Sequence, residues 1–230
     1  MLQKKTSKLF YGKYPYKIET SIPGASLIVR RGIEDTLKFC NSTEVLKVHW
    51  AYRSYVGINK VELNNYINLA QEFIDKDIER DIQIRAEGAH MNFFCKDVAL
   101  YNSIKDKLQE WVVAVTEPGS LEELEYILSN GSKVVLVDAY RKGKFRYKLI
   151  LKINMKKDKR LQFMGWLSNY SGKIEVARST ISWLIGTHHY LAEPFIYVDD
   201  KKTLTMIGLY ISGYIKKVEE YVIRDTLVIE

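Results

Sequence analysis

Hydrophobic residues along this chain follow two different spacings, and the changes between them predict a series of strands and helices. Three short apolar runs between Met91 and Ala139 are typical of buried β-strands. Between these runs, apolar residues recur at helical spacing after Asp97 and again after Ser120, and both residue types are favourable N-caps. This order predicts a central β-α-β-α-β unit, joined either by parallel crossovers or as part of a ferredoxin-like split arrangement.

The segment that follows this unit has the pattern of an antiparallel hairpin. Residues Phe145–Asn154 alternate between apolar and charged side chains, as half-buried strands do, and Leu161–Trp166 is a second apolar run. The polar residues Met155–Arg160 lie between these runs and are expected to form the hairpin loop. The predicted fold class is therefore α+β, with a mixed sheet that contains the central unit and then a basic antiparallel hairpin.

Domain boundaries are weakly marked. No linker rich in Pro, Gly or Ser divides the chain, which favours one domain over residues 1–230. The turn at Pro118-Gly119 is the best candidate for a division, into subdomains 1–118 and 119–230. One internal similarity is present: residues 12–18 and 143–149 share the pattern Gly-Lys-aromatic-x-Tyr-Lys-aliphatic, which indicates either an old duplication, two similar strands in one sheet, or chance.

Charge is distributed unevenly along the sequence. The 230 residues carry a net charge of +7, with 47% hydrophobic and 27% charged residues, the balance of an ordinary globular chain. Ten basic residues and one acid lie between Arg141 and Arg160, whereas acids outnumber bases more than two to one between Val61 and Glu125. A block of one sign creates an oriented field, and a basic block favours polyanionic partners.

Strand geometry would collect the basic residues on one face of the predicted hairpin. Side chains alternate between the two faces of a strand, so Lys144, Arg146, Lys148 and Lys152 would share one face while the aromatic and aliphatic residues between them form the core face. Because the neighbouring aromatic residues lie on the core face, this pattern favours phosphate contact over base stacking.

The same surface could extend in both directions along the chain. The basic residues of the predicted loop would enlarge it, and if the two similar segments were neighbours, two lysines of the first would add to it. The candidate nucleic-acid-binding residues are Lys144, Arg146, Lys148, Lys152, Lys156, Lys157, Lys159, Arg160, Lys13 and Lys17.

These observations predict a non-catalytic, largely sequence-independent nucleic-acid-binding protein, with no cofactor and no metal site. The sequence does not distinguish DNA from RNA or single strands from duplexes. The protein is expected in a reducing cytoplasm, because it has only two cysteines and no apolar run long enough to cross a membrane.

Three alternatives remain open. Lysine on an exposed strand also protects against edge-to-edge aggregation, so the basic face need not bind a ligand. The oppositely charged segments could instead join copies of the chain, as in a virus particle or another multi-subunit assembly.

The third alternative rests on a short resemblance. The segments His90-Met91-Asn92 and Tyr170-Ser171-Gly172-Lys173 resemble motifs of rolling-circle replication nucleases. That resemblance implies a strand histidine that helps to hold a metal ion and a tyrosine nucleophile within a Tyr-x-x-Lys motif. Asn92 stands where those nucleases have a second His or a Gln, which leaves the metal-binding pair incomplete.

Overall fold

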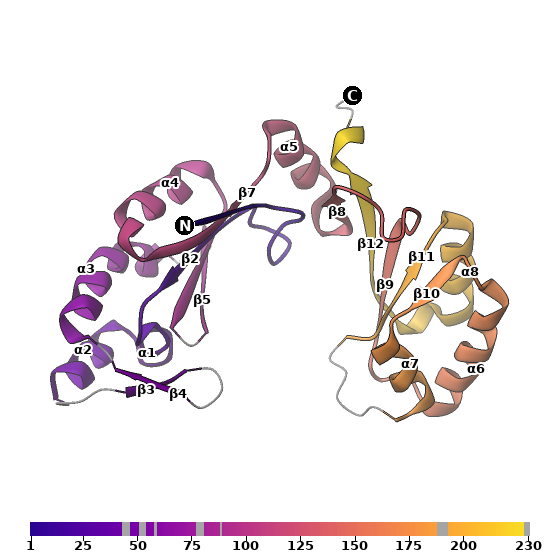
Figure 1. Ribbon diagram of the computed structural model, residues 1–230, viewed down its shortest axis with the longest axis horizontal. Coiled ribbons are helices and arrows are strands. Elements are labelled where there is room, and N and C mark those ends of the chain that lie inside the picture. The colour runs from indigo at the N-terminus through magenta and orange to yellow at the C-terminus, as the bar shows by residue number, and fades with distance from the viewer. Residues whose placement is uncertain are drawn as a thin grey trace. The chain divides into compact units, whose positions relative to one another are not determined.

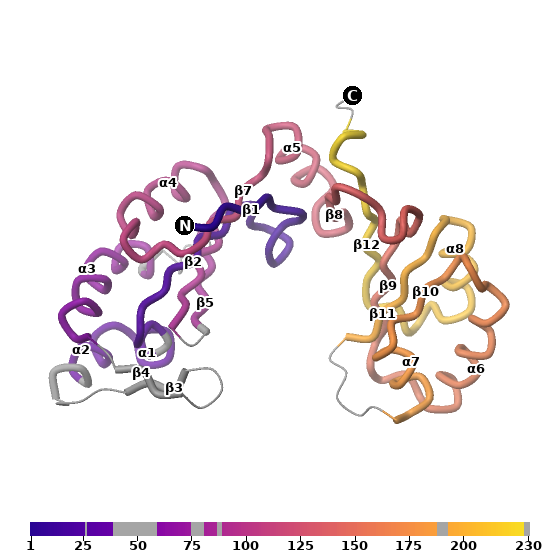
Figure 2. The backbone as a smooth tube through the Cα atoms, viewed as in Figure 1, coloured from indigo at the N-terminus to yellow at the C-terminus, as the bar shows by residue number. Residues whose placement is uncertain are grey.

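The structure, a computed structural model, describes residues 1–42, 47–50, 54–57, 59–76, 81–87, 89–187 and 193–227. The chain divides into two compact units, Met1–Leu124 and Glu125–Glu230, which we call the first and the second unit. Each unit contains one five-stranded mixed sheet together with helices, so the α+β class predicted from the sequence is confirmed (Figures 1 and 2).

The first unit is built on one sheet with a helical layer. Its sheet consists of β1 (Leu2–Lys5), β2 (Tyr16–Ser21), β5 (Ile82–Glu87), β6 (His90–Cys95) and β7 (Val112–Glu117). Its helices are α1 (Ala25–Arg31), α2 (Ile33–Ser42), α3 (Lys60–Lys76) and α4 (Val98–Lys107), and a small hairpin is formed by β3 (Lys47–Trp50) and β4 (Ser54–Gly57). The strand order is β1-β7-β2-β6-β5, in which β1 and β7 are parallel and the other neighbours antiparallel.

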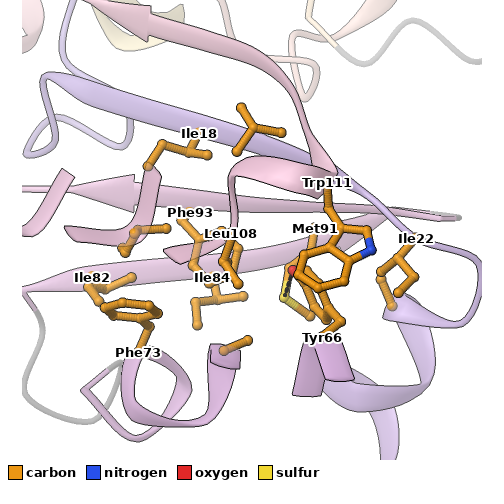
Figure 3. Packing of buried hydrophobic residues seen from close by; sticks show 14 of the residues in the cluster. Ile18, Ile22, Tyr66, Phe73, Ile82, Ile84, Met91, Phe93, Leu108 and Trp111 are labelled. Atoms are coloured by element: carbon orange, nitrogen blue, oxygen red, sulfur yellow. Dashed lines mark hydrogen bonds between the residues drawn. The ribbon is translucent and has the colours of Figure 1, made fainter. Parts of the chain in front are cut away.

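The core of the first unit lies between the sheet and its helices (Figure 3). Burial alternates along β2, as expected for a strand with one face against helices. Tyr66 of α3 is fully buried, and its hydroxyl lies 2.8 Å from the Thr20 hydroxyl and donates to the Met91 sulfur at 3.3 Å. The Trp111 ring meets Tyr66 edge-on at 5.3 Å. The Tyr66 hydroxyl therefore has partners within this core, which limits the cost of burying it.

The second unit has a sheet of the same size. Its strands are β8 (Val134–Val137), β9 (Tyr147–Leu151), β10 (Ile174–Val176), β11 (Phe195–Val198) and β12 (Ile215–Ile223). Its helices are α6 (Lys157–Leu167), α7 (Arg178–Ile185) and α8 (Lys201–Ile211), while α5 (Leu121–Asn130) spans the division between the units. The core packs Leu149 and Ile196 of the sheet against Phe163 of α6, Trp183 of α7 and Ile207 of α8.

The two units share one topology. Read from the edge with the parallel pair, the second sheet has the order β8-β12-β9-β11-β10, which matches β1-β7-β2-β6-β5 strand for strand. In each sheet the last four strands along the chain have the split β-α-β arrangement, in which another strand lies between the two strands that a helix joins. Both units also have a bulge in the equivalent strand. In β12 it lies between Ile215 and Lys217, and in β7 it lies opposite Glu19 and Thr20 of β2.

The sequence similarity noted above coincides with an identical turn before each central strand. Tyr11 and Gly12 have φ angles of +52° and +71°, and Lys142 and Gly143 have +50° and +71°. Isolated antiparallel bridges close both turns, Phe10 with Tyr14 and Arg141 with Phe145. The similar segments therefore have the same role in two repeats of one fold; they are not two strands of one sheet.

Two expectations about the fold need correction. Leu161–Trp166, predicted as a strand, lies within helix α6, where Phe163 and Leu167 are buried one turn apart. A short apolar run fits both the periodicity of a strand and that of a helix, and this segment forms a helix. The predicted loop residues Met155–Arg160 instead lead into α6 and form its first turn. The antiparallel neighbours of β9 are β11 and β12, which come from later in the chain.

The elements of the predicted central unit occur in the expected order but do not share one sheet. Strands β6 and β7 belong to the first sheet, where β2 lies between them, whereas β8 belongs to the second. The Pro118-Gly119 turn lies between β7 and α5, a few residues before Leu124, where the first unit ends. Within the described residues, no helix is long and apolar enough to cross a membrane.

Replacement of Gly143 by Ala should destabilise the protein through backbone strain alone. Gly143 has φ +71°, and no atom lies within 4 Å of an added Cβ. We expect a loss of about 1 kcal/mol in the free energy of unfolding, measured by urea denaturation of the full chain. Gly165→Ala within α6 is the control: there too no atom lies within 4 Å, and alanine in a helix should stabilise by about 0.5 to 1 kcal/mol. Changes of the same sign in both variants would contradict this explanation.

Candidate nucleic-acid interface

The central strand β9 presents two different faces. Leu149 and Leu151 pack into the helical core, together with the half-buried Tyr147. Lys148 and Ile150 point to the opposite face, because side chains alternate along a strand. That face, which we call the open face of the second sheet, lies outside the helical core cluster, although Ile150 on it is only 6% exposed. Within β9 the predicted separation of Lys148 from the apolar core residues is therefore present, whereas Phe145, predicted for the core face, lies outside the core cluster with its ring 6.4 Å from that of Tyr197.

Aromatic side chains from the neighbouring strand lie on the same open face. In β11, Ile196 and Val198 are buried in the core, so Phe195 and Tyr197 point the other way. The register places Tyr197 beside Lys148, and the Lys148 Nζ lies 4.3 Å from the centre of the Phe195 ring. The expectation that aromatic residues would occupy only the core face is thus wrong for the sheet as a whole. Alternation within Phe195–Val198 was visible in the sequence, but the pairing of β11 with β9 was not.

The turn before β9 folds over this face. The Arg141 guanidinium lies 4.6 Å from the centre of the Tyr197 ring and donates to Glu175 at 2.8 Å. The Lys142 ammonium lies 3.2 Å from the other oxygen of the same carboxylate. The hydrogen bond from Arg141 holds the pKa of Glu175 below its ordinary range, and the same contact raises the pKa of Arg141. Both partners are thus charged near neutral pH, and the turn is fixed to β10.

Other predicted basic residues surround the start and end of β9. Lys144 donates to the Gly172 carbonyl, and the Arg146 guanidinium lies 5.5 Å from the Tyr140 ring. Both are exposed. Lys152 lies just beyond the end of β9 and donates to the Gly213 carbonyl at 3.0 Å. These lysines bind carbonyl oxygens, which leaves their positive charges without compensation by those contacts.

Acidic groups on the open face are already engaged. Glu219 of β12 is opposite Lys148 in the register, is 3% exposed, and pairs with Lys217 at 2.9 Å. Glu175 is held by Arg141 and Lys142. Among the described residues, the structure shows no ion pair for Lys144, Arg146 or Lys148. These three cations therefore have no ion pair with a described carboxylate, although the charge of Lys148, after the hydrogen bond from Lys216, helps to lower the pKa of Glu193.

The basic residues predicted for the loop lie elsewhere in the second unit. Lys156 is the N-cap of α6, and Lys157, Lys159 and Arg160 lie in its first turn. Because α6 packs against the core face of the sheet, these residues belong to the helical layer, opposite the open face. Arg160 donates to the Trp183 carbonyl at 2.5 Å and packs over that ring, so its role here is structural. The structure therefore does not form the continuous basic strand-and-loop surface that the sequence predicted.

Lys13 and Lys17 are the first-unit counterparts of Lys144 and Lys148. Lys13 is exposed in its turn, whereas the Lys17 ammonium lies 3.0 Å from the Glu19 carboxylate. Burial raises the pKa of Glu19, but the hydrogen bond and charge of Lys17 outweigh it and keep that pKa below its ordinary value. Because β2 and β9 belong to different sheets, the expectation that their basic faces would add within one sheet is wrong.

The residues of the nuclease resemblance lie in different units. His90 is in β6, with its Nδ1 3.5 Å from Glu19, while Tyr170 lies in the second unit. Tyr170 and Lys173 line a shallow pocket of about 380 Å³, together with Lys202 and Met206. Within the part of the chain that the structure describes, no three His, Cys, Asp or Glu side chains gather closely enough to hold a metal ion.

Comparisons with known proteins do not add a function. No family model, no curated protein and no solved structure matches this chain.

Replacement of Glu175 by Gln should remove a pH-dependent contribution to stability. Because the pKa of Glu175 is lowered in the folded state, its ionised form stabilises the fold above the ordinary glutamate pKa, and this contribution disappears as the pH falls through the folded pKa. Near pH 7 we expect Glu175→Gln to be less stable by about 0.5 to 1 kcal/mol. The difference from the unchanged protein, measured as urea denaturation midpoints, should narrow toward about pH 3. A difference in denaturation midpoint that stayed constant with pH would show that the charge of Glu175 does not contribute to stability.

Proposed function

We propose that this chain is a nucleic-acid-binding protein that contacts the phosphate backbone, largely independently of sequence, through the open face of its second sheet. The observation that carries the proposal is the grouping of Lys144, Arg146 and Lys148, which have no carboxylate partner among the described residues, beside the exposed turn of a sheet that also carries Phe195 and Tyr197. The candidate set is therefore narrower than the one predicted from the sequence.

The arrangement suits a polyphosphate. Residues two apart on a strand repeat every ~6.6 Å, a spacing similar to that of phosphates along a nucleic-acid strand. Lysine and arginine that neutralise phosphates release counterions, which supplies most of the free energy of non-specific binding. Since none of these cations has to break an ion pair with a described carboxylate, binding retains more of that free energy.

The first unit provides the contrast that supports this assignment. Its scaffold and turn are the same, but the lysine equivalent to Lys148 is Lys17, which Glu19 neutralises. A ligand of the first sheet would have to displace that carboxylate, so we assign phosphate binding to the second unit alone. A cytoplasmic location is part of the proposal and is supported by Cys95, a buried free thiol whose pKa burial raises to about 12.

Two variants that remove equivalent charges test the proposal. Lys144→Gln with Lys148→Gln should weaken binding to labelled single-stranded DNA about tenfold near 100 mM salt, measured by fluorescence anisotropy. The slope of log affinity against log salt should become shallower by about 1.4, since two phosphate contacts are lost. Lys13→Gln with Lys17→Gln removes the same two charges from the first unit and should change affinity less than twofold.

Equal losses in both variants would show that only net charge matters, and the proposed site would be wrong. No binding of DNA or RNA by the unchanged protein near 50 mM salt would overturn the proposed function. The basic surface would then be assigned to a protein partner, as in the assembly alternative, and sizing chromatography at low and high salt would show whether that partner is a second copy.

A further inference from the structure

We propose that Arg141 is a stacking platform for one base of a single-stranded nucleic acid. This inference rests on the proposed function and deepens it, because phosphate contacts alone do not distinguish a single strand from a duplex. Arg141 was not among the binding residues predicted from the sequence, where it was counted only as one charge of the basic block.

The guanidinium of Arg141 lies over an aromatic ring and is still accessible. Its central carbon lies 4.6 Å from the centre of the Tyr197 ring, in a cation–π contact. The Arg141 side chain is nevertheless 47% exposed. A planar base would stack on the part of the guanidinium that the Tyr197 ring leaves accessible. Unpaired bases commonly stack on arginine planes as well as on aromatic rings.

The orientation of this plane is fixed before any ligand binds. Arg141 donates from one edge to Glu175 at 2.8 Å, and Glu175 is itself held by Lys142 at 3.2 Å. The Glu175 side chain is only 17% exposed. A guanidinium that already has a ring beneath it and a carboxylate at its edge loses little conformational entropy when a base arrives, so more of the stacking free energy contributes to affinity.

The position equivalent to Arg141 in the first unit also carries a side chain with a planar group. The first-unit residue equivalent to Arg141 is Phe10, whose ring lies 5.3 Å from that of Phe94, the counterpart of Tyr197. In the first unit Tyr11 also meets Phe94 edge-on, at 4.9 Å, so the aromatic residues close over each other. In the second unit Arg141 takes the place of the Phe10 ring, so this position carries an exposed cation instead of an aromatic ring.

Phosphate contacts flank the stacking position. Lys142 and Lys144 belong to the same turn as Arg141, and Arg146 leads from it into β9. A base on Arg141 would therefore have the phosphates of its own strand within reach of these cations. In a duplex both faces of a base are stacked against neighbours, so this contact selects single strands.

Arg141→Lys tests this inference because it keeps the charge and removes the plane. The probes are a labelled oligodeoxythymidine of about ten nucleotides and an oligonucleotide of equal length with abasic sites, which has the phosphates but lacks the bases. We expect the unchanged protein to bind the thymidine oligonucleotide about tenfold more tightly, and Arg141→Lys to bind both about equally. The matched control is Arg85→Lys in the first unit, whose guanidinium lies 5.6 Å from the Tyr11 ring; it should keep the tenfold preference.

The possible results separate this inference from the proposed function. If the unchanged protein binds both oligonucleotides equally, or if Arg141→Lys keeps the preference, the stacking site is wrong while phosphate binding stands. If neither oligonucleotide binds near 50 mM salt, the proposed function fails and the inference fails with it. A preference lost in both Arg141→Lys and Arg85→Lys would also overturn the assignment to Arg141.

Discussion

Burial of the central strand on one side only is the constraint on which both units depend. Ile18 in β2 and Leu149 in β9 hold the same place in the two sheets, and both are 0% exposed. Because side chains alternate, packing Leu149 against the helices turns Lys148 to the opposite face. A register shift by one residue would bury Lys148 in the core, at a cost that the fold could not sustain. The open face is thus a consequence of how the core is made.

The repeats show how one scaffold can carry two different surfaces. The turn, the bulge and the order of the strands are the same in both units, as is an aspartate N-cap, Asp97 or Asp200, on the helix that precedes the last strand. The open faces differ in a few side chains. In the first unit Glu19 neutralises Lys17, and aromatic residues close over Phe94. In the second unit the buried Ile150 stands in place of Glu19, and the exposed Arg141 and Lys142 stand in place of Phe10 and Tyr11. Function is therefore argued from the side chains of each face, since the shared fold alone does not assign it.

The candidate site shows where sequence reasoning was sufficient and where it failed. Alternation identified the two faces of the segment that contains Lys148, and this required only local geometry. The contribution of Tyr197 was missed because it depends on pairing between strands distant in sequence. The basic residues of the predicted loop were assigned to the wrong element because the apolar run Leu161–Trp166 fits both strand and helix periodicity. Packing of Phe163 and Leu167 against the core favours the helix.

Local features were readable from the sequence alone: the α+β class, the helix start at Asp97, and the similarity between the two turns. Each depends on residues close together in the chain, so the physical cause is readable from the sequence. Only the tertiary structure decided that β8 leaves the first sheet, that the two turns belong to repeats, and that Arg141 lies on Tyr197. These follow from long-range strand pairing and core packing, in which several arrangements satisfy the same local pattern and the burial of the whole unit selects one.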